Sequence, residues 1–448
     1  MPIAANPAPR SESDRSGDGL DAPLLTRATV LPFVLITSLF FLWAIPNNLN
    51  DVLIRQFMKS FVMTRLQAGL VQFAFYLGYF FLALPAGFIM RKFGYKSGFL
   101  IGLSLFALGA FLFWPAAIVG QYSFFLAALF VIASGLSFLE TASNPFIAQL
   151  GDQRTAARRL NLAQAFNPLG SITGVLIGTI FIFSDVNLTP AEIAAKKAGH
   201  TYDAYLHSET LRVVNPYLVL SAVTLMMLVL IAATRFPANL TASQDEDQRH
   251  SSVGAFLKKP HFVMAVCAQF AYVGAQVGTW SYFIPYVVTY TPDQNKAAGF
   301  LLTMSLVGFL LGRFFSAWLM RYVQPSLLMG IYCIINTLLV AVGVFSPGWF
   351  GVWTLLLSSF FMSLMYPTIF AQGIRGLGEQ AKMGGSVIVM SIIGGALMPL
   401  AMGYIADKSN SQALAYIVPM AAYVIVGIYS FTDMRIIRRG KELQTQRL

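Results

Sequence analysis

Apolar residues in this chain come in long blocks that short polar clusters separate. Each block has roughly 20 residues, about the length that an α-helix needs to cross the hydrocarbon core of a bilayer. The pattern predicts twelve membrane spans, at about 29–54, 67–90, 98–117, 123–149, 160–183, 213–235, 261–290, 297–320, 326–345, 350–374, 383–406 and 413–433. Because this number is even, both ends of the chain are expected on one side of the membrane.

Composition agrees with an integral membrane protein. Of the 448 residues, 56% are hydrophobic and only 11% are charged, and the mean hydropathy is +0.65. A soluble chain carries about a quarter charged residues. Residues 1–27 are polar and contain no apolar stretch, so they are expected to form a disordered cytoplasmic tail rather than a cleaved signal peptide.

The basic residues predict the orientation. If both termini lie in the cytoplasm, the inside segments hold 21 of the 30 Lys and Arg residues, the outside connectors hold 8, and Arg313 lies within a span. Lys and Arg collect in the cytoplasmic loops of membrane proteins, so this orientation is predicted. The same asymmetry explains the net charge of +11 without a nucleic-acid partner.

A polar segment in the middle of the chain divides the spans into two groups of six. It covers 237–260, so that the predicted units are a six-helix half at 28–236, a cytoplasmic linker, a second half at 261–433 and a basic cytoplasmic tail at 434–448. The predicted fold class is therefore an all-α membrane protein of twelve helices in two halves.

The two halves also resemble each other in sequence. Gly78 and Gly308 are each followed twelve residues later by Met-Arg, and PFIAQLG from Pro145 matches PTIFAQG from Pro367. The offsets are close to half the chain, which indicates a duplicated six-helix unit. Duplicated halves are typical of transporters, in which one half rocks against the other around a site near the midplane of the membrane.

Several other classes of function lack their motifs. No G-x-x-x-x-G-K-[ST] loop occurs, so ATP hydrolysis is not expected, and uphill transport would depend on an ion gradient. Cys267 and Cys333 lie inside apolar blocks, and His200, His207, His250 and His261 lie in or beside polar connectors. We therefore expect no disulfide framework, metal site, buried imidazole relay, cofactor or enzymatic activity.

Glu140 is the clearest functional candidate inside a span. It lies about seventeen residues into the fourth span, after Phe138 and Leu139. A structural ion pair is the alternative, but no basic residue lies at comparable depth in the first half. Charged side chains in hydrocarbon are costly and usually functional. A carboxyl group in an apolar setting can take up and lose a proton near neutral pH, as a proton-coupled carrier requires.

The segment NNLND at 47–51 ends the first apolar run. Asp51 lies some twenty-two residues into its span, and Arg55 follows one turn later, so Asp51 could be an ordinary carboxylate at a helix end. Against this interpretation, VLI follows directly and predicts that the helix continues. The short amides of Asn47 and Asn48 are also better suited to binding a solute than to ending a helix. The depth of Asp51 in its span leaves both interpretations open, a carboxylate at a helix end and a functional group.

Other polar and aromatic side chains share the spans with these carboxylates. Asn167 precedes Pro168, which predicts a bend with an amide at it. Arg313 could either oppose a carboxylate across a cavity or extend to the inner lipid headgroups. Amides bind sugar hydroxyls and rings stack on the apolar face of a sugar, so the remaining candidate sugar contacts are Asn47, Asn48, Gln164, Gln276, Trp280 and Tyr76.

Six stretches of the chain closely resemble the fucose-galactose-glucose:proton symporters of the major facilitator superfamily. They are FFLWAIPNNLNDVL, QAGLVQFAFYLGYFFLALPAGFIMRKFGYKSG, FLETASNPF, RLNLAQAFN, AQFAYVGAQVGTWSY and IVMSIIGGALMP, and the similarity runs from about 33 to 430. The loop after the second span departs from the superfamily pattern, because Arg91 occupies the usual acidic position. A gating role of that aspartate is therefore not carried over.

The resemblance implies proton symport of a monosaccharide, L-fucose or a related hexose such as galactose, glucose, mannose or an amino sugar. It implies a proton-coupling role for Asp51, sugar binding and coupling for Glu140, and a sugar contact for Asn167. It further implies a monomer in the lipid bilayer of a bacterial inner membrane. Two alternatives stay open, a drug:proton antiporter of the same superfamily and a non-transporting sugar sensor. The stretch NPLGSITG has Asn167 where drug antiporters usually carry a glycine.

Overall fold

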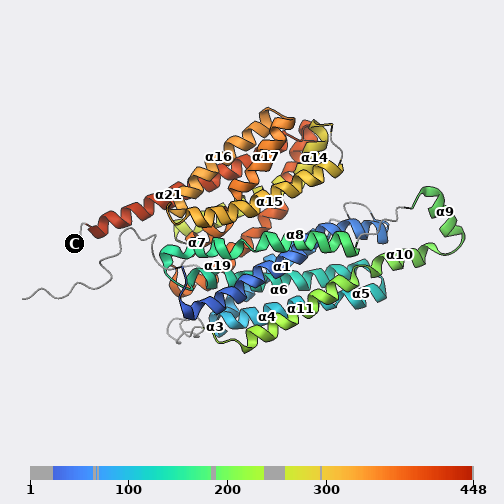
Figure 1. Cartoon of the computed structure of the whole chain (residues 1–448), viewed down its shortest axis with the longest axis horizontal. Coiled ribbons are helices and arrows are strands. Elements are labelled where there is room, and N and C mark those ends of the chain that lie inside the picture. Colours follow the sequence, from blue (N-terminus) through green and yellow to red (C-terminus); the bar gives the residue numbers. More distant parts are fainter. Residues whose placement is uncertain are drawn as a thin grey trace, which may run out of the picture.

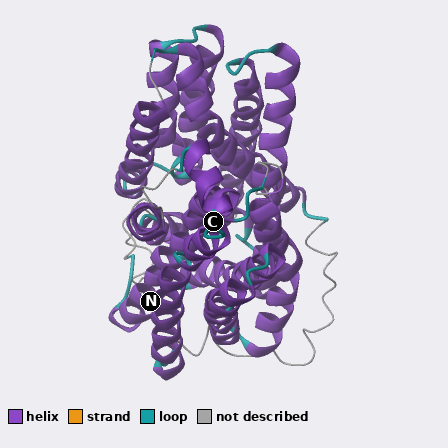
Figure 2. Cartoon of the chain, turned by 90° about the vertical axis from the view of Figure 1, so that its right-hand side faces the viewer, coloured by secondary structure: helices purple, strands orange, loops and turns teal. Residues whose placement is uncertain are grey.

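The protein is a bundle of long helices. The computed structural model describes residues 24–63, 67, 70–182, 188–236, 258–292 and 295–445. Over these ranges the chain forms helices and connecting loops without a strand (Figure 2). Backbone N–H and C=O groups find no water in a bilayer, so a chain this apolar must satisfy them inside helices. The predicted all-α fold class is confirmed.

Six helical stretches of the N-terminal half are long and apolar enough to cross a membrane. Several of them consist of shorter helices joined end to end. They are α1 (Arg27–Ser60); α3 (Leu70–Phe93); α4 (Tyr95–Phe111) with α5 (Phe113–Val119); α6 (Tyr122–Gln149); η2 (Gln153–Thr155), α7 (Ala156–Gln164), α8 (Asn167–Ile177) and η3 (Gly178–Ile182); and α10 (Tyr202–Leu211) with α11 (Val214–Ala233).

The C-terminal half supplies six more such stretches within the described residues. They are α14 (Pro260–Tyr290); α15 (Asn295–Leu319); α16 (Pro325–Phe345); α17 (Trp349–Met362) with α18 (Met365–Gly373); η5 (Gly378–Gln380), α19 (Ala381–Met390), η6 (Ser391–Ile393) and α20 (Gly394–Ser409); and η7 (Leu414–Tyr416) with α21 (Ile417–Thr445). The twelve predicted spans are confirmed. The predicted boundary segment 237–260 lies mostly outside the described residues.

Helix α21 continues to Thr445, past the predicted end of its span at 433 and into the predicted tail. Two helix ends of the N-terminal half also extend well beyond the predicted spans. Helix α1 continues to Ser60, and the sixth stretch begins at Tyr202 instead of 213. Glu209 links them, because the amide of Gln56 donates to its carboxylate at 3.1 Å and Lys59 Nζ lies 3.1 Å from the same oxygen. These contacts stabilise the additional turns of both helices. Hydropathy along the chain does not predict a contact between two helices. A further helix in this connector, α9 (Pro190–Ala198), lies outside the spans.

Figure 1 shows the two halves as two groups of helices, one blue to green and the other yellow to red. The start of α1 and the end of α21 lie at the same end of the molecule, which we call the terminal end. The halves pack together there: α19 lies against α3 and α6, and α7 lies against α15 and α18. This packing is close, because a Cβ on Gly87 of α3 would meet the hydroxyl of Ser386 of α19 at 2.0 Å.

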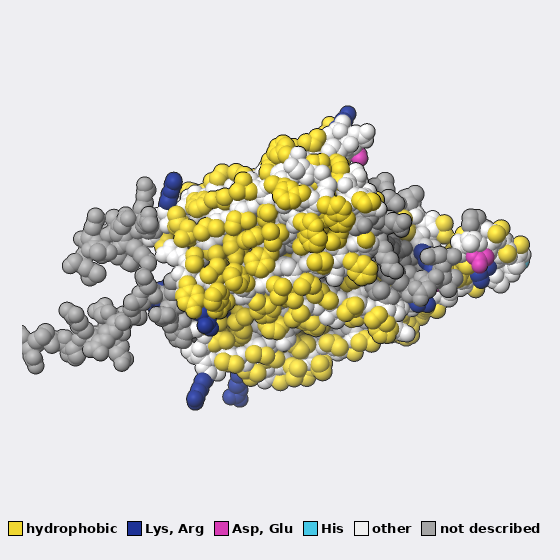
Figure 3. Space-filling view, turned by 45° about the horizontal axis from the view of Figure 1, so that its top comes forward, with side chains coloured by type: hydrophobic (Ala, Val, Ile, Leu, Met, Phe, Trp, Pro, Cys, Tyr) yellow, Lys and Arg dark blue, Asp and Glu magenta, His cyan; other side chains and the backbone are white. Residues whose placement is uncertain are grey.

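The outer surface has the distribution of side chains that a membrane protein needs. Hydrophobic side chains cover the middle of the face in Figure 3, and the Lys and Arg side chains visible there lie towards its ends. Large exposed apolar residues such as Phe81, Val219 and Leu338 belong to this surface. Exposed apolar area of this extent marks contact with lipid. The chain is a multi-pass membrane protein.

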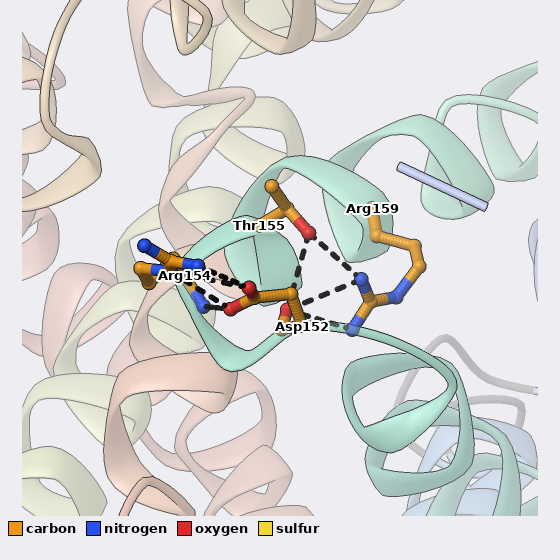
Figure 4. A network of polar contacts seen from close by, with 4 residues as sticks. All are labelled: Asp152, Arg154, Thr155 and Arg159. Atoms are coloured by element: carbon orange, nitrogen blue, oxygen red, sulfur yellow. Dashed lines mark hydrogen bonds and ion pairs between the residues drawn. The ribbon is translucent and has the colours of Figure 1, made fainter. Parts of the chain in front are cut away.

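Arg159 fixes the turn between α6 and α7 at the terminal end (Figure 4). Its guanidinium is fully buried and donates to the carbonyls of Ile147 at 2.7 Å and Ala148 at 2.5 Å, at the end of α6. A cation at this position matches the negative end of the helix dipole. Beside it, hydrogen bonds from Arg154 hold the pKa of the Asp152 carboxyl below its usual range. Arg159 therefore fixes the end of the helix that carries Glu140.

Candidate functional site

Glu140 lies at the contact between the two halves. It belongs to α6, which packs tightly on α4: a Cβ on Gly135 would lie 2.5 Å from the backbone of Phe106. The side chain is 9% exposed, and the hydroxyl of Tyr366 on α18 donates to its Oε1 at 2.5 Å. Because Tyr366 comes from the C-terminal half, this hydrogen bond joins the halves at a carboxyl group.

The other side chains in contact with this carboxyl group are uncharged, and the charge of Arg313 acts on it from beyond ion-pair distance. Tyr79 of α3 and Asn144, one turn along α6, both lie beside it. No Lys, Arg or His of the described residues comes within ion-pair distance of Glu140. The structural ion pair considered as an alternative for Glu140 is therefore not formed among these residues. A hydroxyl group can partner either the protonated or the ionised carboxyl.

Repeat symmetry explains why two of these neighbours meet here. Asn144 precedes Pro145, and Tyr366 precedes Pro367, so the two residues occupy equivalent positions in the duplicated motif. Both flank the Glu140 carboxyl group, one from each half. Sequence reasoning did not select Tyr366 as a site residue. The sequence repeat could have identified Tyr366, because Tyr366 occupies the position equivalent to Asn144, which follows Glu140 by four residues.

Gln164 and Arg313 continue the polar contacts away from Glu140. The Gln164 amide donates to Asn144 Oδ1 at 2.8 Å. Arg313 Nη1 donates to the Gln164 backbone oxygen at 2.5 Å and lies 3.3 Å from its Oε1. Arg313 is 4% exposed, so of the two open predictions the one that placed it at the headgroups is wrong. It faces the other half and contacts an amide instead of a carboxylate.

The NNLND segment lies in the interior of α1, because the helix runs on to Ser60. The predicted continuation past Asp51 is thus confirmed, although the side chain of Asp51 lies outside what the structure describes. Asn47 lies beside the hydroxyl of Tyr79, which in turn lies beside Glu140. Asn48 donates back to the Ala44 carbonyl at 2.9 Å. The segment therefore approaches the Glu140 site through Asn47.

The remaining candidate residues are distributed over both halves. The bend predicted at Pro168 is confirmed, since α7 ends at Gln164 and α8 begins at Asn167. The Asn167 amide donates to the Phe40 carbonyl of α1 at 3.2 Å and not to Glu140. The Trp280 indole donates to Ser359 at 3.1 Å.

The last two candidates are Tyr76 on α3 and Gln276 on α14. The hydroxyl of Tyr76 lies beside Gly395 of α20 in the other half. Gln276 is half-buried on α14. The structure therefore brings Asn47 and Gln164 to the surroundings of Glu140 and leaves Asn167, Trp280 and Gln276 in other contacts.

Another buried carboxylate, Asp433, was missed from the sequence. His261 Nε2 lies 2.7 Å from its Oδ1, Ser326 donates to its Oδ2 at 2.5 Å, and Arg375 also pairs with it. Sequence reasoning placed His261 beside a polar connector and gave no sign of its contact with Asp433, which forms because the start of α14 packs against α21. Asp433 sits at the end of a hydrophobic run, where a carboxylate gives no distinct signal in the sequence. No group of residues suited to a metal ion occurs in the described part.

Comparison with known proteins agrees with this architecture. The model of the Major Facilitator Superfamily matches residues 32–399, so the chain belongs to this superfamily of transporters. The L-fucose-proton symporter of Escherichia coli (strain K12) is 43% identical over 412 residues, which cover 90% of this chain and 93% of the relative. The glucose/galactose transporter of Brucella abortus biovar 1 (strain 9-941) is 32% identical over 400 residues, 88% of this chain and 92% of the relative.

The fold is also similar to a solved structure. The crystal structure of a major facilitator superfamily transporter, FucP, in the outward conformation superposes with a TM-score of 0.83 at 42% sequence identity, over 91% of this chain and 99% of that one. The similarity thus extends over nearly the whole length of both proteins. The chain is a transporter and not an enzyme.

Proposed function

We propose that this chain imports L-fucose or a related hexose together with a proton. The observation that carries the proposal is the buried Glu140 carboxyl group, which is hydrogen-bonded at 2.5 Å by Tyr366 of the other half. The relatives include an L-fucose-proton symporter and a glucose/galactose transporter, which supports a hexose as the substrate. Galactose and glucose are therefore the first alternatives to L-fucose.

The mechanism follows from the position of Glu140 between the halves. A carboxyl group in an apolar setting favours its neutral form, so proton binding removes a buried charge. The bond to Tyr366 must break when the halves separate at the terminal end. Protonation of Glu140 therefore changes the strength of its hydrogen bond to Tyr366, which exists only in the conformation closed at the terminal end. Proton binding is in this way coupled to alternating access.

Asp51 is the second proposed proton-coupling residue. It lies one turn after Asn47 on α1, and Asn47 lies beside Tyr79 and so close to the Glu140 site. The resemblance of its motif to the sugar:proton symporters supports the same role. Asp51→Asn should stop or uncouple proton-linked uptake, and intact coupling in this variant would leave Asp51 without a role.

The proposed sugar contacts are carboxyl, amide and aromatic side chains from both halves: Glu140, Asn167, Asn47, Asn48, Gln164, Gln276, Trp280 and Tyr76. In the present conformation Gln164 is bonded at both ends of its amide, so a sugar contact there requires one of these bonds to break. The Trp280 ring is held by Ser359 and by Phe309, whose ring centre lies 5.1 Å away. A ring fixed in this way suits stacking against the apolar face of a sugar.

The proposed location is the inner membrane of a bacterium, with the terminal end in the cytoplasm and the protein acting as a monomer. The excess of Lys and Arg in the segments at that end supports this orientation. Because the halves pack together at the terminal end, the conformation described here is then closed to the cytoplasm. The similarity to a structure in the outward conformation supports the same interpretation.

The test is proton movement caused by sugar. Energy-starved cells that contain the protein are exposed to L-fucose, galactose, glucose, mannose and an amino sugar in turn, and the external pH is recorded. We expect alkalinisation with at least one of these sugars, and its loss when a protonophore is present. A panel in which no monosaccharide moves protons would overturn the proposal, and proton release caused by cationic drugs would indicate an antiporter instead.

A further inference from the structure

Arg313 is a buried cation whose partners come from both halves. On its own side, Nε donates to the Ser363 carbonyl at 3.0 Å, and the guanidinium lies 4.7 Å from the centre of the Phe309 ring. On the other side, Nη1 donates to the backbone oxygen of Gln164 at 2.5 Å. Among the described side chains no carboxylate lies within ion-pair distance of it.

A buried cation without a counter-ion is unfavourable unless dipoles surround it. Arg313 is stabilised by two carbonyl oxygens and an aromatic face, and Tyr272 and the more distant Glu140 carboxyl group also interact with it. The shorter of the two carbonyl bonds crosses between the halves. The residue that it contacts there, Gln164, also holds Asn144 at 2.8 Å, and Asn144 lies beside Glu140. A continuous series of contacts therefore leads from Arg313 to the carboxyl group.

We propose that Arg313 is a positioning residue of the transport cycle. It holds the terminal end closed by binding Gln164 across the two halves, and it keeps the Gln164–Asn144 pair in place beside Glu140. It must release Gln164 whenever the terminal end opens. This inference rests on the proposed function, because only an alternating-access transporter requires that release.

The contact is suited to repeated release. When the halves separate, the guanidinium loses the Gln164 carbonyl but gains access to water, which replaces part of the lost interaction. Its bond to Ser363 lies within one half, so it keeps the side chain in position for the contact to form again. A bond between two neutral buried groups would gain less from hydration when it opens.

Substitution by lysine should weaken the contact even though the charge remains. The planar guanidinium donates to two carbonyl oxygens at fixed angles, and a compact ammonium group does not reproduce this geometry. Arg313→Met removes the charge and leaves an apolar side chain of similar length, so it also avoids an unpaired buried cation. Both variants should therefore open the terminal end more often than the unmodified chain.

The experiment measures how often the terminal end opens. Ser386 is fully buried where α19 meets α3, so Ser386→Cys is made in the full chain together with Cys267→Ala and Cys333→Ala. The rate at which an impermeant maleimide modifies the introduced thiol is measured in inside-out vesicles. We expect Arg313→Lys and Arg313→Met to raise this rate about tenfold, the effect of losing one hydrogen bond to a charged group. Gln164→Ala, which leaves the carbonyl in place, should raise it less.

Arg321→Lys is the matched control, since Arg321 is an exposed arginine just beyond the end of α15. It should leave the labelling rate unchanged. Unchanged labelling in both Arg313 variants at normal abundance, or an equal increase in Arg321→Lys, would overturn the proposal. Labelling needs neither sugar nor a proton gradient, so failure of this proposal is distinguishable from failure of the proposed symport.

Discussion

Two of the buried carboxyl groups in the described part of the chain, Glu140 and Asp433, differ in the kind of surroundings they have. Asp433 is completely buried and is contacted by Arg375, His261 and Ser326, all from its own half. Glu140 is bonded by the neutral hydroxyl of Tyr366 from the other half. A carboxylate with basic partners inside one rigid unit keeps both its charge and its contacts. A carboxyl group whose partner is neutral and belongs to the other half can change both its charge and its contacts.

This difference supports the proposed transport role of Glu140 and predicts a structural role for Asp433. Breaking the contacts of Asp433 would loosen the C-terminal half itself, since they join the first turns of α14 and α16 to the interior of α21. Breaking the contact of Glu140 instead removes a hydrogen bond between the two halves and leaves the contacts within each half in place. Burial alone therefore does not identify a transport residue. The identity and location of the partner distinguish the two cases.

The largest expected effect is that of Glu140→Gln. The amide keeps the size of the side chain but cannot exchange a proton, so sugar should equilibrate across the membrane without being accumulated. Concentrative uptake of labelled sugar by energised cells is the measurement, normalised to the amount of protein in the membrane. Accumulation at the unmodified level would show that Glu140 does not couple the proton.

Asp433→Asn should act on stability instead. It leaves Arg375 and His261 without their counter-charge, which we expect to lower the free energy of unfolding by about 1–3 kcal/mol. The loss is smaller than for a fully buried pair, because the side chains of Arg375 and His261 are 35% and 22% exposed. Thermal unfolding in detergent measures it, with the exposed Asp407→Asn as the control.

A transport assay of the same Asp433→Asn variant tests whether Asp433, like Glu140, takes part in coupling. Accumulation per folded molecule should stay close to that of the unmodified protein, since no contact of Asp433 crosses between the halves among those described. Loss of accumulation at normal stability would show that the Asp433 cluster takes part in coupling.

Tyr366→Phe has the smallest expected effect. It removes one hydroxyl group and keeps the ring, so Glu140 loses its bond to the other half. We expect the initial rate of uptake to fall about tenfold, which corresponds to roughly 1.4 kcal/mol, with normal abundance. Tyr217→Phe is the matched control, because the Tyr217 hydroxyl is buried without a hydrogen-bond partner in the described part of the chain. Equal effects in both variants would contradict a special role of Tyr366.

The sequence by itself determined the twelve helices, and it predicted the division into two halves and a transport role for Glu140. The physical reason is that the bilayer imposes one strong rule: apolar blocks of a fixed length cross it, and a carboxyl group inside such a block stands out. The break at Pro168 follows from the missing N–H group of proline in the same direct way.

Only the tertiary structure decided which groups meet. Tyr366 lies 226 positions from Glu140 and Arg313 lies 149 from Gln164, and their contacts depend on how the halves pack at the terminal end. The partners of Asp433 likewise come from three other segments of the chain. Hydropathy measures the tendency of each segment to enter the bilayer, but contacts between helices depend on rotation and depth, which one sequence does not specify.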